Sequence, residues 1–439
     1  MKSNDLDPAQ HGARRARLAQ AMQGGIAVIP TAPERIRNRD THFPYRYDSY
    51  FYYLTGFAEP EAVLVVVAGP QPRSLLFCRE KDEERETWDG FRFGPKGAQE
   101  RFGFDEAHPI SELDAKLAAL LGDQPALYYP VGADAEWDAR AIGWLNAVRA
   151  QSRSGVGVPE RVQDVRALVD EMRLVKDAHE LGVMRRAAAI SAAAHKRAIR
   201  AARPGRFEYE LEAELLYEFR RGGAQFPAYW PIVAGGANAC VLHYVSNEDI
   251  LRDGDLVLID AGCELAGYAS DITRTFPVGR RFSGEQRAVY ELVLAAQAAA
   301  MDKVRAGAAW NEPHDAAVRV LAQGMIDLKL LAGGLDEALE KETYKRFYMH
   351  RTGHWLGLDV HDAGDYKRAG KWRSLVPGMV LTVEPGLYIR AAEDVPERLR
   401  GIGIRIEDDV LVTAGACDIV TKETPKSVAD IEALKRDAG

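Results

Sequence analysis

The sequence predicts an α+β protein, because long amphipathic helices alternate with short apolar strands without a regular βαβ rhythm. Hydrophobic residues make up 47% of the 439 positions and charged residues 28%, which is enough to build a sizeable core. A chain of this length suggests two or three domains. We expect two: a smaller α/β domain over residues 1–175 and a larger α+β domain over residues 176–439.

Two strands and one helix are expected in the first third of the chain. The apolar runs 61–67 (EAVLVVV) and 74–77 are bounded by Gly and Pro, as strands commonly are. Residues 111–121 follow a helical period, and we expect Ser111 to cap that helix. The Gly- and Ser-rich segment 151–159 (QSRSGVGVP) indicates a loop, which we take to be interdomain.

The remaining residues alternate long helices with short strands. A helix over 177–202 is rich in alanine and is followed by Pro204 and Gly205, which are typical helix stops. Further helices are expected over 208–221, 284–305 and 312–330. Strands are expected over 256–260, 271–276, 379–384 and 402–408.

Charge and cysteine usage exclude several classes of protein. The chain has 57 Lys and Arg against 65 Asp and Glu, a net charge of −8, and so lacks the basic excess of a typical nucleic-acid binder. Its four cysteines do not make a disulfide scaffold, which favours a reducing compartment. The N-terminal segment has no apolar run of secretory-signal length, and no run approaches the roughly 20 residues of a membrane span. We therefore expect a cytoplasmic protein that binds neither nucleic acid nor membrane.

Two aspartates stand at the ends of apolar strands. Asp260 ends the run LVLID, and Asp271 opens DITRTF. A carboxylate that closes a buried strand is costly unless it is paired or binds a metal. Asp260 is equally explained as the start of a turn, because Ala261 and Gly262 follow it. A short connection containing Gly262 and Gly267 would form a hairpin with both carboxylates on one side.

Residues 350–362 (HRTGHWLGLDVHD) are unusually rich in histidine. They contain three of the ten histidines in the chain, His350, His354 and His361. Gly353 beside His354 lets the backbone approach a site closely, which favours a ligand role for that histidine. The alternative is a loop whose histidines are solvated or packed in the core.

Two glutamates occupy strand-like runs in the last quarter of the chain. Glu384 lies in VLTVEPGLYI, where Pro385 follows it, and Glu407 lies in GIGIRIEDDVLV. At the strand period, Arg405 and Glu407 share a face. A surface strand with an ion pair across that face explains this pattern as well.

Together these residues supply four carboxylates and one imidazole. Oxygen ligands with one imidazole suit two divalent ions such as Mn²⁺, Co²⁺ or Zn²⁺ rather than a thiolate site. Two such ions would balance the charge of the four carboxylates, which would otherwise repel one another strongly. We therefore predict a dinuclear metal site.

The residues quoted above resemble those of a known family. Asp260, Asp271, His354, Glu384 and Glu407 have the order and contexts of the methionine aminopeptidase–prolidase metallopeptidases, whose fold is called pita-bread. The segment HRTGHWLGLDVHD resembles the proline-peptidase signature of that family, and the segments around the four carboxylates are similar to theirs. Residues 37–66 (RNRDTHFPYRYDSYFYYLTGFAEPEAVLVV) resemble the N-terminal domain of the bacterial Xaa-Pro aminopeptidases in this family.

The resemblance implies hydrolysis of the bond between the first residue of a peptide and a proline in second place. It also implies a role for each ligand. Asp260 would chelate the first metal ion, and Asp271 and Glu407 would bridge both ions. His354 and Glu384 would bind the second ion.

The resemblance implies roles for further residues around the metals. His243, in CVLHYVSNED, and His361 match two substrate-side histidines that would stabilise the oxyanion. His350, which opens the signature, is assigned to substrate binding. Glu384 would also move the proton of the attacking water, and Arg405 would hold a bridging carboxylate.

Three positions are expected to shape substrate selection. Tyr229 precedes His243 in an aromatic-rich segment, Trp88 lies in ETWDGFRFG, and Arg153 lies in the loop 151–159. Trp88 matches a residue that reaches a neighbouring subunit in the bacterial family, which implies a homo-oligomer, a dimer or a tetramer. A structural role, as core aromatics and a solvated charge, remains open for all three. The signature departs from many relatives at Arg351, where they carry glycine, and this is expected to alter the rim of the pocket.

Three other functions remain to be separated from this one. A prolidase, restricted to Xaa-Pro dipeptides, would use the same metal ligands, but segment 37–67 and Arg153 favour the aminopeptidase. A non-catalytic pita-bread module that binds protein would have lost metal ligands, and all five are present here. Creatinase-like amidino hydrolysis uses the fold without these ligands and is disfavoured for the same reason.

Overall fold

The computed structural model describes residues 8–436. The chain divides into two compact units, the first up to Arg173 and the second from Leu174 onward. Both units mix helices with sheets, so the predicted fold class is confirmed. Among the described residues no helix is both long and apolar enough to cross a membrane.

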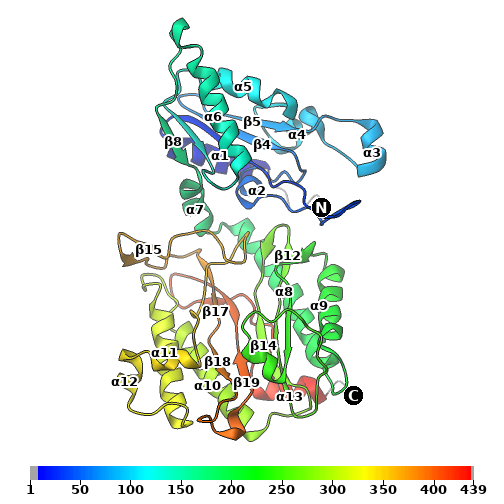
Figure 1. The fold of residues 1–439 in the computed structure, drawn as a ribbon, viewed down its shortest axis with the longest axis vertical. Helices are drawn as coiled ribbons and strands as arrows, with labels where there is room; N and C mark the ends of the chain where they lie inside the picture. The colour runs from blue at the N-terminus through cyan, green and yellow to red at the C-terminus, as the bar shows by residue number, and fades with distance from the viewer. Residues whose placement is uncertain (1–7, 437–439) are drawn as a thin grey trace. The chain divides into compact units, whose positions relative to one another are not determined.

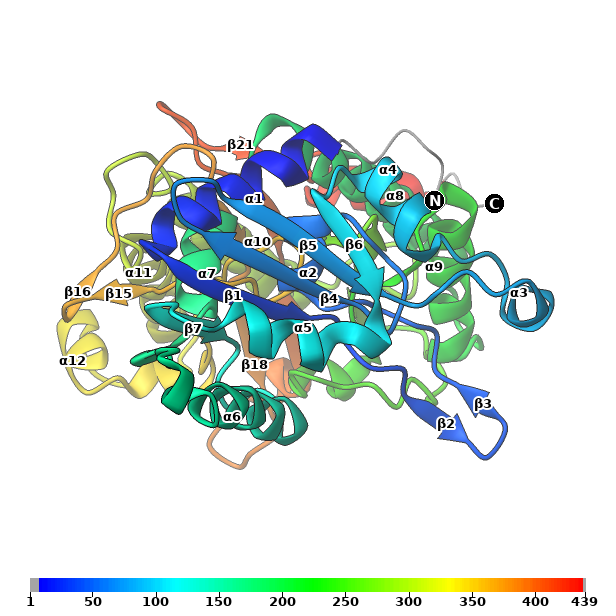
Figure 2. The same cartoon turned by 90° about the horizontal axis from the view of Figure 1, so that it is seen from above.

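The first unit is built on a six-stranded mixed sheet (Figures 1 and 2). The pairs β1–β4 and β4–β5 are antiparallel, whereas β1–β7, β7–β8 and β5–β6 are parallel. In sheet order its strands are β6 (Glu106–Pro109), β5 (Arg73–Cys78), β4 (Val63–Ala68), β1 (Gly25–Pro30), β7 (Ala126–Tyr129) and β8 (Arg161–Asp164).

Helices cover the sheet because its strands are apolar on their faces. Leu113 and Leu117 of α5 and Trp144 and Val148 of α6 pack on the strand residues in one buried cluster. The helices of this unit are α1 (Pro8–Met22), α2 (Ser49–Thr55), α3 (Glu83–Asp89), α4 (Gly94–Phe102), α5 (Leu113–Leu120), α6 (Ala135–Arg149) and α7 (Arg166–Leu174). A small exposed hairpin, β2 (Ile36–Asn38) and β3 (Thr41–His42), precedes α2.

Two expectations for the first unit are wrong in detail. Ser111 does not cap a helix, because it lies inside a 3₁₀ turn, Ile110–Glu112, that leads directly into α5. The loop 151–159 contains a second 3₁₀ turn, Ser152–Ser154, and is followed by β8 and α7 of the same unit. Arg153 therefore belongs to the first unit and not to the segment of chain that joins the two units.

The second unit carries short antiparallel sheets between two pairs of helices. Figure 1 shows its strands between the pair α8 (Ala178–Ala201) and α9 (Glu208–Gly222) and the pair α10 (Gly284–Met301) and α11 (Glu312–Asp327). Asp177 begins α8 with a capping box to Glu180, as Ser283 begins α10 with Gln286. Shorter helices are α12 (Leu335–Glu340) and α13 (Val428–Arg436).

Three small sheets position the chemistry. The first joins β10 (Ile232–Gly235), β11 (Leu256–Asp260) and β14 (Thr273–Pro277); the second joins β17 (Val380–Val383), β20 (Asp408–Leu411) and β21 (Asp418–Ile419); the third pairs β18 (Gly386–Ile389) with β19 (Ile402–Arg405). The remaining strands are β9 (Phe226–Pro227), β12 (Cys263–Leu265), β13 (Tyr268–Ala269), β15 (Lys367–Arg368) and β16 (Lys371–Trp372).

The predicted strand 402–408 is two strands rather than one. β19 pairs with β18, whereas β20 pairs with β17, and residues 406–407 between them belong to neither sheet. The chain changes sheets at this point, so Glu407 lies at a junction. Helices α10 and α11 end at Met301 and Asp327, a few residues earlier than the periodicity predicted.

Candidate metal centre and active site

The acidic residues singled out in the sequence lie where strands of the second unit end. Asp260 is the last residue of β11, Glu384 directly follows β17, and Glu407 lies between β19 and β20. β14 begins at Thr273, so Asp271 precedes that strand instead of opening it. β11 and β14 do pair antiparallel, with Asp260 opposite Thr273, but their connection is long enough to hold the extra hairpin β12–β13.

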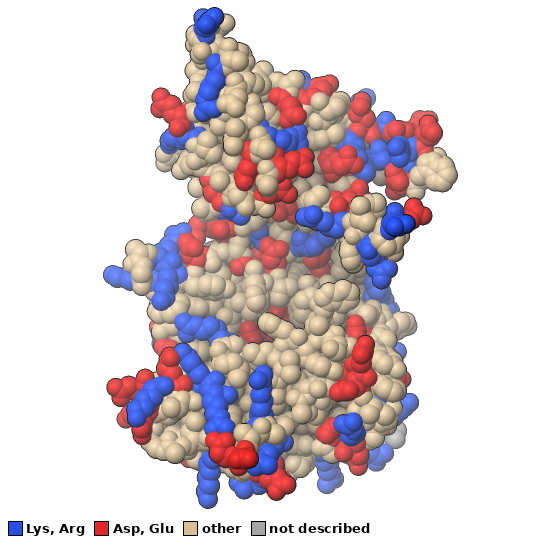
Figure 3. Space-filling model, viewed as in Figure 1, with Lys and Arg blue, Asp and Glu red and all other residues tan. Residues whose placement is uncertain are grey.

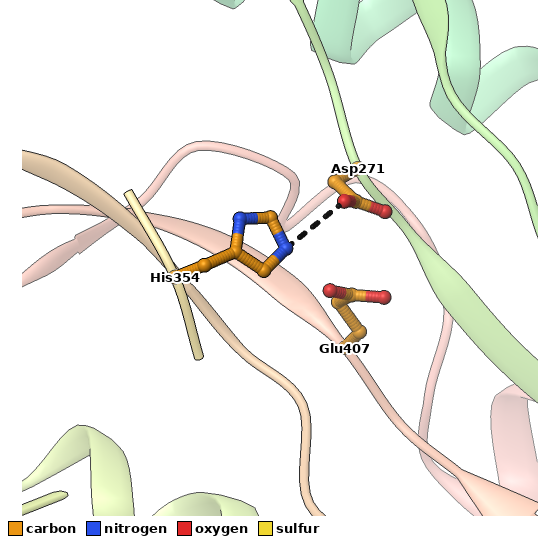
Figure 4. A group of neighbouring side chains, drawn as sticks. All are labelled: Asp271, His354 and Glu407. Atoms are coloured by element: carbon orange, nitrogen blue, oxygen red, sulfur yellow. Dashed lines mark ion pairs between the residues drawn. The ribbon is translucent and has the colours of Figure 1, made fainter. Parts of the chain in front are cut away.

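Asp271, His354 and Glu407 converge on one point (Figure 4). One ligand atom from each lies within 4.8 Å of the other two, and all three side chains are buried. His354 Nε2 lies 3.4 Å from an oxygen of Asp271 and 3.7 Å from an oxygen of Glu384. The structure thus brings together residues from four separate segments of the sequence.

The backbone around His354 presents its Nε2 atom to the carboxylates. The Nδ1–H group donates a hydrogen bond to the carbonyl of Trp355 at 2.9 Å, which leaves Nε2 as the atom directed at the cluster. A backbone partner of this kind is the usual way in which a metal-binding histidine is oriented. Gly353 is required here, because a Cβ atom at that position would lie 2.0 Å from the carbonyl oxygen of Thr382.

Burial and mutual repulsion dominate the electrostatics of the cluster. Burial raises the pKa of Asp271, and it raises that of Glu384 to about 7. Burial, together with the nearby Asp271 and Glu384, raises the pKa of Glu407 well above its ordinary value. Burial alone would lower the pKa of His354, but the hydrogen bond that its Nε2–H donates to Asp271 and the neighbouring carboxylates outweigh it and raise the pKa to about 9.

This donor set fits divalent metal ions. Burying several carboxylates together is unfavourable unless positive charge accompanies them. Oxygen ligands with one imidazole Nε2 are also the donors that Mn²⁺, Co²⁺ and Zn²⁺ accept.

Tyr229 and Arg405 hold the aspartates in place. The Tyr229 hydroxyl lies 2.6 Å from an oxygen of Asp260 and also contacts Asp271, so it can donate its proton to either carboxylate. Arg405 donates to Asp260 at 2.6 Å and to Thr273 at 3.1 Å, and Thr273 in turn donates to Glu407 at 2.6 Å. Arg405 thus contacts Asp260 directly and reaches Glu407 through Thr273, and its expected role of holding a bridging carboxylate stays a prediction.

Three further histidines lie around the cluster. His350 is locked by two hydrogen bonds: its Nδ1–H donates to the carbonyl of Arg351 at 2.7 Å, and its Nε2 accepts from the Tyr388 hydroxyl at 2.8 Å. Burial lowers its pKa to about 3, so it is neutral. The His361 ring lies 4.2 Å from the ring of His354, and within residues 8–436 neither His361 nor His243 uses its ring in a hydrogen bond. Both rings are exposed and free to contact a substrate.

The five predicted metal ligands and the three further histidines line a cavity of about 750 Å³ in the second unit. Its floor carries the carboxylates, and its walls are largely aromatic and aliphatic. The wall residues are Tyr229, Trp230, Ile232, Leu242, Val245, Trp310, Val360, Tyr366 and Trp372. A cavity of this size, with apolar walls and convergent charged groups and histidines, is typical of a small-ligand site.

Trp88 and Arg153 belong to the first unit. Trp88, on α3, is 80% exposed, and Arg153 is exposed in its 3₁₀ turn. The residues that line the cavity all come from the second unit. The substrate roles expected for Trp88 and Arg153 therefore stay predictions.

Sequence reasoning missed several residues that support the site. Thr382 accepts from the backbone N–H of His354 at 3.1 Å, and Asp409 accepts from that of Asp271 at 3.1 Å. Tyr388 links Arg405 to His350. Thr273 carried a usable signal, because it lies two residues after Asp271 in the same strand-like run and shares its face.

A buried carboxylate–histidine cluster at the floor of an apolar cavity defines a metal-dependent hydrolase. The family model of metallopeptidase family M24 matches residues 182–414, and that of the aminopeptidase P N-terminal domain matches residues 11–128. The Xaa-Pro aminopeptidase of Haemophilus influenzae is 45% identical over 423 residues, which cover 96% of each chain.

Solved structures of similar proteins indicate the same family. Aminopeptidase PepP of Pseudomonas aeruginosa is 51% identical, with a TM-score of 0.97 and 99% of both chains covered. Zinc-substituted E. coli aminopeptidase P in complex with product is 44% identical, with a TM-score of 0.96 and 99% of both chains covered. The chain belongs to metallopeptidase family M24, and its first unit is an aminopeptidase P N-terminal domain.

Proposed function

We propose that this enzyme removes the N-terminal residue from peptides that carry proline in second place. The observation that carries the proposal is the convergence of Asp271, His354 and Glu407 at the floor of the cavity, in a chain whose full-length relatives are Xaa-Pro aminopeptidases. Asp260 and Glu384 complete the set of five ligands for two divalent ions. Mn²⁺ is the first choice, with Co²⁺ and Zn²⁺ as alternatives.

Two bound ions would activate a water molecule near neutral pH and polarise the carbonyl of the scissile bond. The protein supplies the proton transfers. Glu384 is the group proposed to take the proton of the attacking water and pass it to the leaving nitrogen of proline. Glu384 lines the cavity beside the other proposed ligands, a position from which a carboxylate can exchange a proton with a water molecule held there.

His243 and His361 are proposed to stabilise the negative charge on the carbonyl oxygen. Both rings line the cavity and are not held by other groups, which suits a donor that must contact substrate. The bond before proline has no N–H group, so a site that acts on the carbonyl through metals and histidines loses nothing with this substrate. The acidic floor offers a place for the free amino group, and cleavage therefore begins at the first bond.

The test compares Xaa-Pro, Xaa-Pro-Yaa and Xaa-Ala-Yaa peptides on metal-reconstituted enzyme, with the products identified. Release of the first residue from Xaa-Pro-Yaa is expected. Activity confined to Xaa-Pro dipeptides would instead identify a prolidase, and no hydrolysis of any of the three would support a binding role.

The histidine roles need a separate measurement. His243→Ala and His361→Ala are each expected to bind metal normally and to lose about 10²–10³-fold in kcat, the usual cost of removing one such group. A variant with near-wild-type kcat would remove that histidine from the mechanism.

We further propose that Arg153 contacts the peptide beyond proline and that Trp88 reaches the site of a neighbouring subunit in a dimer or tetramer. Arg153→Ala should then lower kcat/KM for tripeptides and longer peptides more than for dipeptides, which have nothing to contact it. Equal losses on both would refute this role. We also propose a cytoplasmic location, which the low cysteine content supports.

A further inference from the structure

A positively charged rim borders the cavity at the β15–β16 hairpin. Arg351 and Trp372 both line the cavity. The Arg351 guanidinium lies 5.0 Å from the centre of the Trp372 ring, and the Lys367 ammonium lies 3.9 Å from the same ring. Both distances are within the range of cation–π attraction. We call Arg351, Lys367 and Trp372 the cationic rim.

The charges of this rim are not neutralised by the protein. Within residues 8–436 neither Arg351 nor Lys367 forms an ion pair, and both side chains are exposed. Residues 366–383 contain four cationic side chains and no carboxylate. Figure 3 shows Lys and Arg side chains gathered over the position of β15.

The rim and the floor of the cavity carry opposite charges. The floor holds four carboxylates, which attract cations, while the rim holds an arginine whose guanidinium lies against the Trp372 ring. An ordered guanidinium loses little further entropy when it binds a carboxylate in its planar, two-pronged geometry. A peptide has the matching polarity, with a free amine at one end and carboxylate groups further along.

We propose that the cationic rim binds a carboxylate of the substrate located beyond the proline. This inference rests on the proposed aminopeptidase function. The carboxylate is either the C-terminus of a short peptide or the side chain of Asp or Glu, and the two present the same chemistry to Arg351. The rim thereby favours peptides that are acidic after the scissile bond.

The experiment measures kcat/KM on two matched pairs of peptides. The first pair is Ala-Pro-Leu and its C-terminal amide, and the second is Ala-Pro-Glu-amide and Ala-Pro-Gln-amide. Each pair differs by one negative charge beyond proline. The variants are Arg351→Gln, Arg351→Lys and Lys367→Met, with Arg287→Gln as a control that removes one exposed charge of α10 away from the cavity.

Wild type is expected to prefer the charged member of at least one pair by about three- to fivefold, as suits a solvent-exposed ion pair. A preference in the first pair identifies the C-terminal carboxylate, and one in the second identifies the acidic side chain. Arg351→Gln should bring the ratio to about one, Arg351→Lys and Lys367→Met should reduce it in part, and Arg287→Gln should preserve it.

The proposal is overturned if wild type shows no preference in either pair. It is also overturned if the preference survives in both Arg351→Gln and Lys367→Met. Lys367→Met keeps the test available should Arg351→Gln fold poorly, because Lys367 lies on an exposed hairpin. Absence of hydrolysis with all four peptides would refute the aminopeptidase function instead.

Discussion

Glu407 and Asp408 are adjacent in sequence and equally buried, yet their surroundings favour opposite charge states. The pKa of Asp408 lies below its ordinary value, whereas that of Glu407 lies well above it. Burial raises both values, so burial cannot explain the difference. The difference comes from the partners that each side chain meets.

Asp408 is surrounded by cations and donors. Arg274 Nη2 and Lys426 Nζ each lie 2.7 Å from one of its oxygens, and Thr421 and Gln297 donate to the same carboxylate. Arg274 is itself fully satisfied: its five N–H groups reach Asp408 and four backbone carbonyls. Arg274 and Asp408 thus form a buried ion pair in which every donor of the arginine is satisfied. Its role is structural, because it joins the strands where the chain passes from β19 to β20.

Glu407 meets other acids instead. Its nearest donor is the Thr273 hydroxyl at 2.6 Å, and Asp271, Glu384 and Asp260 surround it. Arg405 acts to lower the pKa of Glu407, but its ion pair is with Asp260, and burial and the neighbouring carboxylates outweigh it. The comparison of Glu407 with Asp408 therefore separates two kinds of buried carboxylate. One that forms ion pairs with cations of the protein is structural, whereas one that forms none is a candidate metal ligand.

The sharpest test of this comparison is the Glu407→Gln variant. It should lower kcat by about 10³-fold or more, because a metal ion contributes several kcal/mol to catalysis and about 1.4 kcal/mol is a factor of ten. The metal-free protein should keep its stability, since the raised pKa keeps Glu407 protonated without metal and Gln is likewise uncharged. Metal content, kcat and urea unfolding measure these effects, and a near-wild-type kcat would contradict the assignment.

The Arg274→Met variant tests the other half of the comparison. It leaves the buried Asp408 with Lys426 as its one remaining ion-pair partner, and so should reduce the free energy of unfolding by about 3–5 kcal/mol, as loss of one partner of a buried pair does. Urea denaturation of the metal-free protein measures this. Arg287→Met on exposed α10 is the control, with an expected change below about 0.5 kcal/mol. Equal effects of the two substitutions would refute a structural role for the pair.

The pH dependence of the metal-free protein follows from the cluster. The folded-state pKa of His354, about 9, exceeds its unfolded value, so its stabilising contribution is complete below about pH 6.5 and is lost towards pH 9. The raised pKa of Glu384 makes the protein lose stability as pH rises to about 7. The lowered pKa of His350 acts in the opposite direction, but only below about pH 6.5.

The free energy of unfolding of the metal-free protein should therefore fall by about 2–3 kcal/mol between about pH 6.5 and 9. Urea unfolding at several pH values after removal of metal by a chelator measures this fall. The His354→Gln variant should flatten the profile. A wild-type profile that is already flat would show that the cluster is not electrostatically strained.

The smallest effect is expected from Lys426→Met. Lys426 is partly exposed, and Asp408 keeps its contact with Arg274 in this variant. Loss of this one contact should cost about 1–2 kcal/mol. A loss as large as that of Arg274→Met would mean that the two cations act as one unit, which a double variant with non-additive losses would show.

The sequence alone identified the chemically important positions of the second unit. Asp271, Glu384 and Glu407 were recognisable because a charge inside or beside an apolar strand is costly, and such costs are accepted at functional sites. His354 was recognisable because glycine precedes it within a histidine-rich segment. The structure brings Asp271, His354 and Glu407 together, while the role of each ligand remains a prediction.

The supporting network was not predictable from local sequence. Thr273 donates to Glu407 across 134 positions, and Arg405 donates to Asp260 across 145. Both contacts depend on which strands become neighbours, and a strand's own sequence does not specify its partner. The same limit explains why residues 402–408 were predicted as one strand, because the period of two continues through the break between β19 and β20.

The sequence by itself therefore determined the fold class and the residue types of the site, since these follow from periodicity, composition and motif order, and the family through the resemblance of its motifs. Only the tertiary structure decided which buried acid is neutralised and which is not. Glu407 and Asp408 are adjacent acidic residues, so local sequence patterns do not distinguish them. Their different charge states come from Arg274 and Lys426 on one side and three carboxylates on the other. Electrostatic energy depends on distances in space, which only the packed strands and helices define.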